Sequence, residues 1–313
     1  MEKLNHRYIA RIKVEAITPL FVGSGGASLI TDALAVRDHN GLPMIPGTSL
    51  TGVLRHSLED FSKGNNNWND IFGYQGKDND GLGSRLIISS GYLVLGNGKI
   101  AEGLNTEISS EILSKFQKLP TRQHVKITHK GVAEDKGLFD NEVVYAGAQF
   151  IFEIELKGTK ADEDSWKQII KEIKSPSFRI GQGTRDGYGN LKVIGLYEKV
   201  YNLENENDFE AYLNLNPSLN SIEIEHLEEE ENNNTADYTL DLTPDDFFIF
   251  SEGFGDAEVD NKPTEEEIIV YNDGKIDFEN RTLIPASSIK GAIAHRTAFH
   301  YNKLNKFYAD TIN

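Results

Sequence analysis

The sequence predicts an α+β fold whose core is an antiparallel sheet. Two stretches, 8–16 and 149–158, alternate apolar and polar residues with the period of a strand. Two other stretches carry apolar residues at helical spacing, one from Thr48 onward and one at 164–174. The connecting segments contain many Gly, Asn and Pro residues, which favour turns. A β-rich pattern with two helices is typical of an antiparallel α+β domain.

The first predicted strand, 8–16, is half-buried. Glycines at 23–26 end it, and a short second run at 32–38 precedes a turn with Asn-Gly and two prolines. The first helix follows, and Thr48 or Ser49 can cap it by accepting a hydrogen bond from an orphan backbone N–H. Its apolar residues are Leu50, Val53, Leu54, Leu58 and Phe61. In the strand, Tyr8, Ala10, Ile12, Val14 and Ala16 share one face, and Arg11, Lys13 and Glu15 lie on the other.

The next elements continue the same pattern. A loop rich in Gly, Asn and Asp precedes a strand, and a weakly alternating stretch predicts an extended hairpin. A second strong strand leads to a short amphipathic helix, and a glycine-rich loop then enters a last strand. The loop covers 63–84, the strand after it 85–96 and the hairpin 118–147. The second strong strand covers 149–158, the helix 164–174 and the glycine loop 181–189.

Composition limits the classes of protein to which the chain can belong. It has no cysteine, which excludes disulfides and thiolate metal sites. It has no run of about 18 apolar residues and no apolar stretch near its first residue, so we expect a cytoplasmic protein with no membrane partner. The formal net charge is −17, but residues 1–200 carry 25 Lys+Arg and 24 Asp+Glu, whereas 201–313 carry 7 and 25. The first part can therefore present a basic groove to nucleic acid, and the acidity of the second part is equally typical of a solvated surface.

Two segments of the chain recur in the same order. "IPGTSLTGVLRH" at 45–56 returns as "IPASSIKGAIAHR" at 284–296, and the Thr-Pro strand at 12–26 resembles 238–256. Two independent recurrences indicate a duplicated module. We therefore predict a complete module at 1–200, an acidic Asn- and Glu-rich linker at 201–237, and the N-terminal part of a second module at 238–313.

Two segments can hold phosphate groups. In the loop 181–189 ("GQGTRDGYG"), glycines let backbone N–H groups approach a phosphate and Arg185 adds a charge, although a tight connection needing positive φ predicts the same glycines. The loop enters a strand rather than a helix, which excludes a dinucleotide fingerprint. At 45–56, a helix end rich in Ser and Thr with Arg55 can also hold phosphate, and an ordinary capped helix with a surface Arg has the same sequence.

Two further candidates carry charge or acid–base groups. Asp32, with Asp38 nearby, follows the glycine stretch, where a carboxylate can bind Mg²⁺ or orient an RNA 2′-hydroxyl, although a lone loop Asp is more often a turn former. The hairpin 122–136 contains several basic residues, which suit contact with nucleic acid. A hairpin tip that is simply exposed to solvent would have the same composition. The hairpin residues with this property are Arg122, His124, Lys126, His129 and Lys130.

Taken in chain order, these segments resemble the RAMP superfamily, and they are most similar to the crRNA-binding backbone subunit of type III CRISPR effector complexes. The similarity covers residues 7–198. It rests on 18–56, "DIFG" at 70–73, "SRLIIS" at 84–89, 131–154 and the glycine loop. The Ile-Pro turn and the glycine loop are specific only when they occur together.

The resemblance implies a modified ferredoxin-like, RNA-recognition-type antiparallel sheet with helices on one face and a protruding "thumb" hairpin at about 122–140. It implies that Asp32 cleaves paired target RNA with Mg²⁺ or another divalent metal, which Asp32 binds. It places contacts to the crRNA backbone on Ser49, Arg55, Gly181, Gly183 and Arg185, with Arg122, Lys126, His129 and Lys130 on the thumb and Ser288 and Lys290 in the second module. The implied partners are crRNA, complementary target RNA, and neighbouring RAMP, large and small effector subunits.

The chain departs from the family pattern at several positions. Thr51 stands where the family turn usually has Lys, and Phe21 stands where many members have His. In the second module Lys290 restores the lysine, but Glu267 occupies the position of the cleaving Asp, with Asp256 and Asp260 as other candidates. Ala294 replaces the Arg that corresponds to Arg55. We therefore expect a second module that binds RNA and cuts poorly or not at all.

Three functions follow as hypotheses. The first is a crRNA-binding backbone subunit with metal-dependent, RNA-guided endoribonuclease activity through Asp32. The second is an RNA-binding scaffold subunit of the same complexes with no catalysis. The third is a metal-independent crRNA-processing endonuclease that depends on histidines such as His129.

Overall fold

A computed structural model of the chain describes most of its residues. The described residues are 3–29, 31–61, 68–76, 81–105, 108, 110–128, 132–222, 224–227, 241, 243–247, 250–251 and 259–306. Side chains within this set are left undescribed at a few positions inside helices and strands, among them Lys126.

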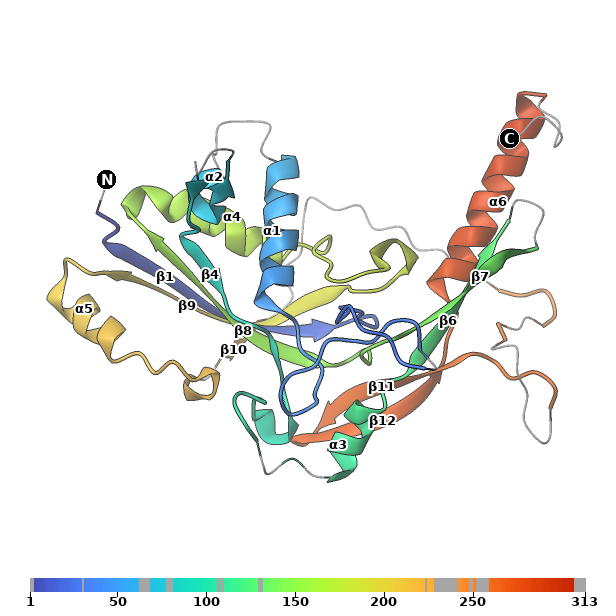
Figure 1. Cartoon of the computed structure of the whole chain (residues 1–313), viewed down its shortest axis with the longest axis horizontal. Coiled ribbons are helices and arrows are strands. Elements are labelled where there is room, and N and C mark those ends of the chain that lie inside the picture. The colour runs from blue at the N-terminus through green and yellow to red at the C-terminus, as the bar shows by residue number, and fades with distance from the viewer. Residues whose placement is uncertain are drawn as a thin grey trace.

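The centre of the molecule is an antiparallel sheet with the order β10–β9–β1–β8–β4, and β5 also pairs with β8 (Figure 1). Four of these strands and two helices follow one another as β1, α1, β4, β8, α4, β9. With β1 between β8 and β9, and β4 outside β8, this arrangement is ferredoxin-like, so the predicted fold is confirmed. The bounds are β1 His6–Ala16, α1 Gly47–Phe61, β4 Leu86–Ile88, β5 Tyr92–Leu93, β8 Gln149–Gly158, α4 Glu163–Ile173, β9 Leu191–Asn202 and β10 Glu225–His226.

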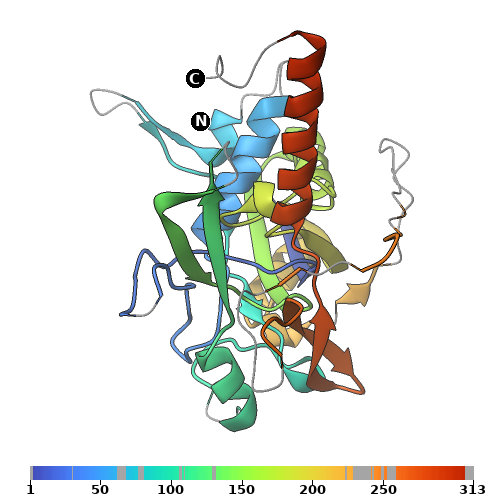
Figure 2. The same cartoon turned by 90° about the vertical axis from the view of Figure 1, so that its right-hand side faces the viewer.

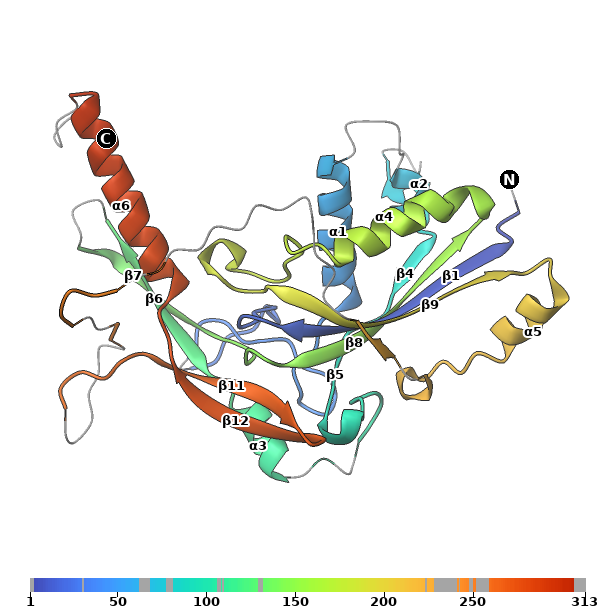
Figure 3. The same ribbon diagram turned by 180° about the vertical axis from the view of Figure 1, so that it is seen from behind.

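Helices α1 and α4 cover one face of the sheet (Figures 1 and 3). Leu50, Leu54 and Leu58 of α1 are buried in the same cluster as the apolar face of β1. Trp166 of α4 is buried with its ring centroid 5.7 Å from that of Tyr8. Each such buried side chain contributes roughly 1.5–3 kcal/mol relative to exposure, so the helical spacing seen in the sequence accounts for this layer.

The other face of the sheet is partly covered. Arg11 of β1 is fully buried there, because residues that follow β9 fold back over it. These residues include α5 (Glu206–Leu213) and the short 3₁₀ turn η4 (Leu219–Ser221). Both elements lie inside the range 201–237 predicted as a linker. Asn and Glu composition did not reveal them, since most of their side chains remain exposed.

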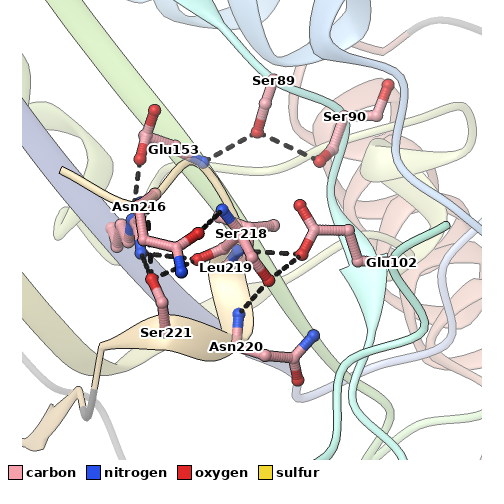
Figure 4. Close-up of polar contacts among 10 residues, drawn as sticks. Ser89, Ser90, Glu102, Glu153, Asn216, Ser218, Leu219, Asn220 and Ser221 are labelled. Atoms are coloured by element: carbon pink, nitrogen blue, oxygen red, sulfur yellow. Dashed lines mark hydrogen bonds and ion pairs between the residues drawn. The ribbon is translucent and has the colours of Figure 1, made fainter. Parts of the chain in front are cut away.

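The buried guanidinium of Arg11 holds this segment in place. Its Nε donates to Glu153 at 2.7 Å, Nη1 donates to the Ser218 carbonyl at 2.8 Å and to Ser221 Oγ at 2.9 Å, and Nη2 donates to the Asn216 carbonyl at 2.7 Å. Figure 4 shows how the same turn is fixed from its other side, where Ser218 and the Leu219 N–H point to Glu102. A buried charge is tolerated when its hydrogen bonds are satisfied in this way.

The remaining strands form three two-stranded sheets. The thumb hairpin is β6 (Thr121–Ile127) and β7 (Ala133–Glu142), and a second hairpin, within the range predicted as a second module, is β11 (Glu265–Asn272) and β12 (Lys275–Thr282). The third pairs β2 (Tyr74–Gln75) with β3 (Gly81–Leu82). The short helices are α2 (Asn69–Phe72), η1 (Gly96–Gly98), α3 (Ser110–Gln117), η2 (Lys160–Asp162) and η3 (Thr184–Asp186).

The β11–β12 hairpin packs into the core of the first module. Ile269 and Ile276 belong to the main apolar cluster, and the Ile269 N–H donates to the Ala146 carbonyl at 2.8 Å. Phe278 of β12 packs edge-on against Phe116 and Tyr145. The start of the predicted second module therefore shares a hydrophobic core with the first.

Helix α6 (Ala286–Leu304) follows β12 and projects from the body of the molecule at the same end as the thumb hairpin (Figures 1 and 2). Nearly all of its side chains are exposed, in contrast to α1, which has the repeated sequence. None of the helices among the described residues is long and apolar enough to cross a membrane.

Candidate nucleic-acid interface

The glycine loop has a backbone that only glycine can adopt. Gly181 has φ +92°, and a Cβ added there would lie 2.2 Å from the Phe21 carbonyl oxygen. Gly183 has φ +72°, and its Cβ would lie 2.5 Å from the ring of Tyr188. The loop is also tied to the segment 18–23 that follows β1, because the Gln182 N–H donates to the Phe21 carbonyl at 2.8 Å. Close packing therefore accounts for these two glycines without a ligand.

Arg185 is a cation of this loop, and its guanidinium has no partner among the described residues. It lies in η3 at the loop's tip, its side chain is exposed, and it makes no hydrogen bond or ion pair with any residue that the structure describes. A guanidinium in this state is free to pair with a phosphate.

The base of α6 lies against the same loop. Lys290 Nζ is 2.9 Å from Asp186 Oδ1, and a Cβ on Gly187 would lie 2.7 Å from the Cβ of Ala286. Ser288 is exposed in the first turn of α6, beside Lys290. The second copy of the Ile-Pro turn thus meets the glycine loop of the first module, a contact that no local feature of the sequence predicts.

We define the thumb base as His124, Phe139 and Asp140, where β6 and β7 meet the rest of the molecule. His124 and Phe139 are paired across the hairpin and their rings stack at 5.0 Å. Tyr188 of the glycine loop lies edge-on to His124, with its hydroxyl 3.2 Å from Nε2. The thumb base and the glycine loop are therefore in direct contact.

The His124 imidazole is partly buried, and burial lowers its pKa from 6.5. Asp186 opposes this shift, Arg122 adds to it, and a side-chain hydrogen bond to Asn141 opposes it. The neutral ring is therefore favoured in the folded protein.

Asp32 meets the thumb base at Asp140. It is exposed, and the Asp32 N–H donates to Asp140 Oδ1 at 2.8 Å while the Asp140 N–H donates to Asp32 Oδ2 at 3.0 Å. The glycine loop therefore contacts His124 of β6 and Asp32 contacts Asp140 of β7, and Phe139, which pairs with His124, is adjacent to Asp140. Asp38, by contrast, caps its own turn, because its Oδ1 accepts from the N–H groups of Asn40 and Leu42, each at 2.8 Å.

Two residues that are predicted to contact RNA, Arg55 and Arg122, form hydrogen bonds or ion pairs within the protein. Arg55 donates to Glu59 at 2.7 Å, to the Gly73 carbonyl at 3.0 Å and to Asn69 Oδ1 at 2.8 Å, so it joins α1 to α2. Arg122 forms an ion pair with Glu266 of β11 at 2.7 Å, with both side chains mostly buried.

Ser49 lies half-buried in the first turn of α1, where its N–H donates to the Pro46 carbonyl at 2.9 Å. The RNA contacts assigned to Ser49, Arg55 and Arg122 stay predictions, and the two arginines have a structural role in addition.

Several other predicted residues lie outside the part that can be described. His129, Lys130 and Asp256 fall there entirely, and the side chain of Lys126 does too. Glu267, at the position predicted to correspond to the cleaving Asp, pairs with Lys115. The pKa of Tyr145 is raised mainly by burial and further by Glu267. Asp260 is exposed. Glu267 therefore takes part in the contact between β11 and α3.

The chain is similar to known proteins in sequence pattern and in structure. The family model of the RAMP superfamily matches residues 13–192. Among solved structures, a chain of "Type III-B Cmr-beta" in the apo state matches with a TM-score of 0.46 and 16% identity over 59% of this chain and 96% of the other. A chain of "Type III-B Cmr-beta bound to cognate target RNA" matches with a TM-score of 0.47 and 15% identity over the same shares. None of the curated proteins matches the sequence.

Proposed function

The chain belongs to the RAMP superfamily, and from this premise we propose that it is a crRNA-binding subunit of a type III CRISPR effector complex. We propose further that it cleaves guide-paired target RNA through Asp32 with a divalent metal. One observation carries the proposal. The exposed Asp32 and the glycine loop with its free Arg185 contact the same thumb base, so one surface offers both a phosphate-binding cation and a reactive carboxylate.

The RNA-binding part of the proposal rests on Arg185, Lys290 and the thumb. Cations on a fixed loop hold the RNA backbone without reading sequence, as a guide-binding subunit requires. Exposed apolar side chains of the hairpin, Val125, Leu138 and Phe139, supply faces against which bases can stack. Residues 216–221 cover part of the opposite sheet face, around Arg11, which favours the thumb end as the surface for RNA.

The catalytic part rests on Asp32. Among the described residues no group of three or more His, Asp or Glu side chains could hold a metal ion. The Asp32 carboxylate fits the donor set of Mg²⁺, which commonly takes one or two carboxylates and completes its shell with water and substrate phosphate. When bound, such an ion would stabilise charge on the scissile phosphate. Asp32 itself would orient the 2′-hydroxyl of a nucleotide splayed by the thumb, so that it stands in line with that phosphate.

Guide binding and cleavage are tested separately in one set of variants. The full chain is mixed with guide RNA in a mobility-shift titration across salt concentrations. In the variant carrying both Arg185→Ala and Lys290→Ala, affinity falls for every guide sequence and the salt slope decreases by about 0.7 per lost contact. Lys167→Ala, which removes an exposed cation on α4, is the matched control and binds as the parent does. If the double variant binds guide RNA as tightly as the parent, these two residues do not bind the RNA backbone as proposed.

For cleavage, labelled target RNA complementary to the guide is incubated with Mg²⁺ or with EDTA. Asp32→Ala retains guide binding and loses cleavage, and Asp164→Ala, an exposed carboxylate of α4, changes neither. Unchanged cleavage in Asp32→Ala would contradict the catalytic role of Asp32, and guide binding by the parent without any cleavage would identify a binding subunit that lacks this activity. Cleavage of repeat RNA that resists EDTA and is lost in His129→Ala would instead identify a crRNA-processing enzyme.

A further inference from the structure

We propose that Asp140 of the thumb is the positioning residue for Asp32, so that the thumb strand β7 sets the orientation of the reactive carboxylate. This inference rests on the cleavage proposed above. It concerns a residue to which neither the sequence motifs nor the family resemblance gives a role.

The contact between the two residues is reciprocal. Asp140 Oδ1 accepts from the Asp32 N–H at 2.8 Å, and Asp32 Oδ2 accepts from the Asp140 N–H at 3.0 Å. The first bond fixes the backbone of Asp32 and the second fixes its side chain. A carboxylate that accepts a backbone N–H bond is held more firmly than one in a free loop, because the bond is charge-assisted.

Beyond this pair, further bonds continue along β7 toward its C-terminal end. Ala33 and Asn141 form a parallel bridge, and the Glu142 N–H donates to the Ala33 carbonyl at 2.9 Å. The Ala35 N–H donates to Glu142 Oε2 at 3.0 Å. The segment that carries Asp32 is thus attached residue by residue to the strand that carries Asp140.

This arrangement leaves one carboxylate oxygen of Asp32 available. Oδ2 is occupied by the Asp140 N–H, whereas Oδ1 accepts no hydrogen bond from any residue that the structure describes. Fixing one oxygen orients the other, and preorganisation of a reacting group is a general source of rate enhancement. Since Asp140 belongs to the thumb, a displacement of the thumb by bound RNA would also displace Asp32.

Two substitutions separate positioning from direct participation. Asp140→Asn keeps an oxygen that accepts from the Asp32 N–H and removes the negative charge, whereas Asp140→Ala removes the acceptor. With the full chain, guide RNA, complementary labelled target RNA and Mg²⁺, we expect Asp140→Asn to cleave within about threefold of the parent. We expect Asp140→Ala to cleave about 10–100-fold more slowly with unchanged guide affinity, as is typical of residues that orient a ligand. Asp135→Ala, an exposed carboxylate of the same strand, is the control and cleaves like the parent.

Amide hydrogen exchange gives a readout that does not depend on activity. The Asp32 N–H is protected in the parent and in Asp140→Asn, and it exchanges faster in Asp140→Ala. Parent-like cleavage by Asp140→Ala, or unchanged exchange at Asp32, would overturn the positioning role. An equal loss of cleavage in Asp140→Asn and Asp140→Ala would also overturn the positioning role, because it would show that the charge of Asp140 is the essential property. Failure of the proposed function is distinguishable, because in that case Asp32→Ala itself would cleave normally.

Discussion

At the residue scale, buried polar groups act through their hydrogen bonds rather than through their charge alone. Arg11 shows this most clearly, because its fully buried guanidinium joins β1, β8 and the turn at 216–221. Removing one partner from such a network leaves Glu153 and two carbonyl groups without their donor. The cost of an unsatisfied buried group exceeds the net gain of the bond it replaces.

We expect Arg11→Ala to lower the free energy of unfolding by about 3–5 kcal/mol, because it leaves a carboxylate unpaired. Urea denaturation measures the change, with Arg281→Ala, an exposed ion pair on β12, as the control that stays near the parent value. Limited proteolysis should cut near 203–222 earlier in Arg11→Ala. A loss below 1 kcal/mol would contradict the role of Arg11 as the anchor of this segment.

His124 makes stability depend on pH at the thumb base. Burial lowers the pKa of His124 in the folded protein below 6.5. As the pH falls, this histidine is therefore protonated in the unfolded chain before it is protonated in the folded protein. The folded state is therefore fully favoured above about pH 6.5 and loses stability as pH falls toward the lower folded pKa. We expect the difference in urea midpoint between the parent and His124→Gln to change between pH 7.5 and 5.5, with the parent losing more. A difference that is constant with pH would contradict this assignment.

At the scale of the element, the glycine loop and the repeated Ile-Pro turn have different reasons for their sequences. The loop needs glycine because of positive φ and the close approach of the segment 18–23 that follows β1. Gly52 lies in the first turns of α1, where an added Cβ meets nothing within 4 Å. The same substitution should therefore have opposite effects at the two sites.

Gly181→Ala should destabilise the protein by about 1–3 kcal/mol, since it combines backbone strain with a clash against the Phe21 carbonyl. Gly52→Ala should stabilise it by about 0.5–1 kcal/mol, because alanine loses less backbone entropy in a helix. Thermal unfolding of the two variants beside the parent measures both signs. A neutral Gly181→Ala would show that the loop adopts another conformation in solution.

At the scale of the whole molecule, the two predicted modules are joined through a shared core. Ile269 and Ile276 of the β11–β12 hairpin lie in the main apolar cluster, and ion pairs from Glu266 and Glu267 reach β6 and α3. We therefore expect the hairpin and the first module to unfold together rather than as separate domains.

Ile269→Ala tests this cooperativity. Both tryptophans, Trp68 and Trp166, lie in the first module, so their fluorescence reports on that module alone. We expect the tryptophan transition in urea to lose about 2–5 kcal/mol, the usual cost of truncating a buried Ile. Ile293→Ala, on the exposed face of α6, is the control with little effect. An unchanged tryptophan transition in Ile269→Ala would show that the hairpin folds independently.

Local sequence determined the periodic parts of this protein. Alternation and helical spacing identified β1, β8, α1 and α4, and the fold class followed from them, because these patterns record which face each element buries. The repeated turn, the glycine loop and Asp32 were visible as motifs for the same reason, since each needs particular residues at adjacent positions.

Tertiary structure decided which of these residues meet. Arg55 and Arg122 are surface cations by sequence, yet both are occupied within the protein, and Arg11 is buried by a segment about 200 residues away in the chain. Asp140 meets Asp32, and Lys290 meets Asp186, through contacts between elements distant in sequence. Such pairings depend on strand register and on how helices dock. Neither leaves a local periodic trace, so the arrangement of the site became visible only in three dimensions.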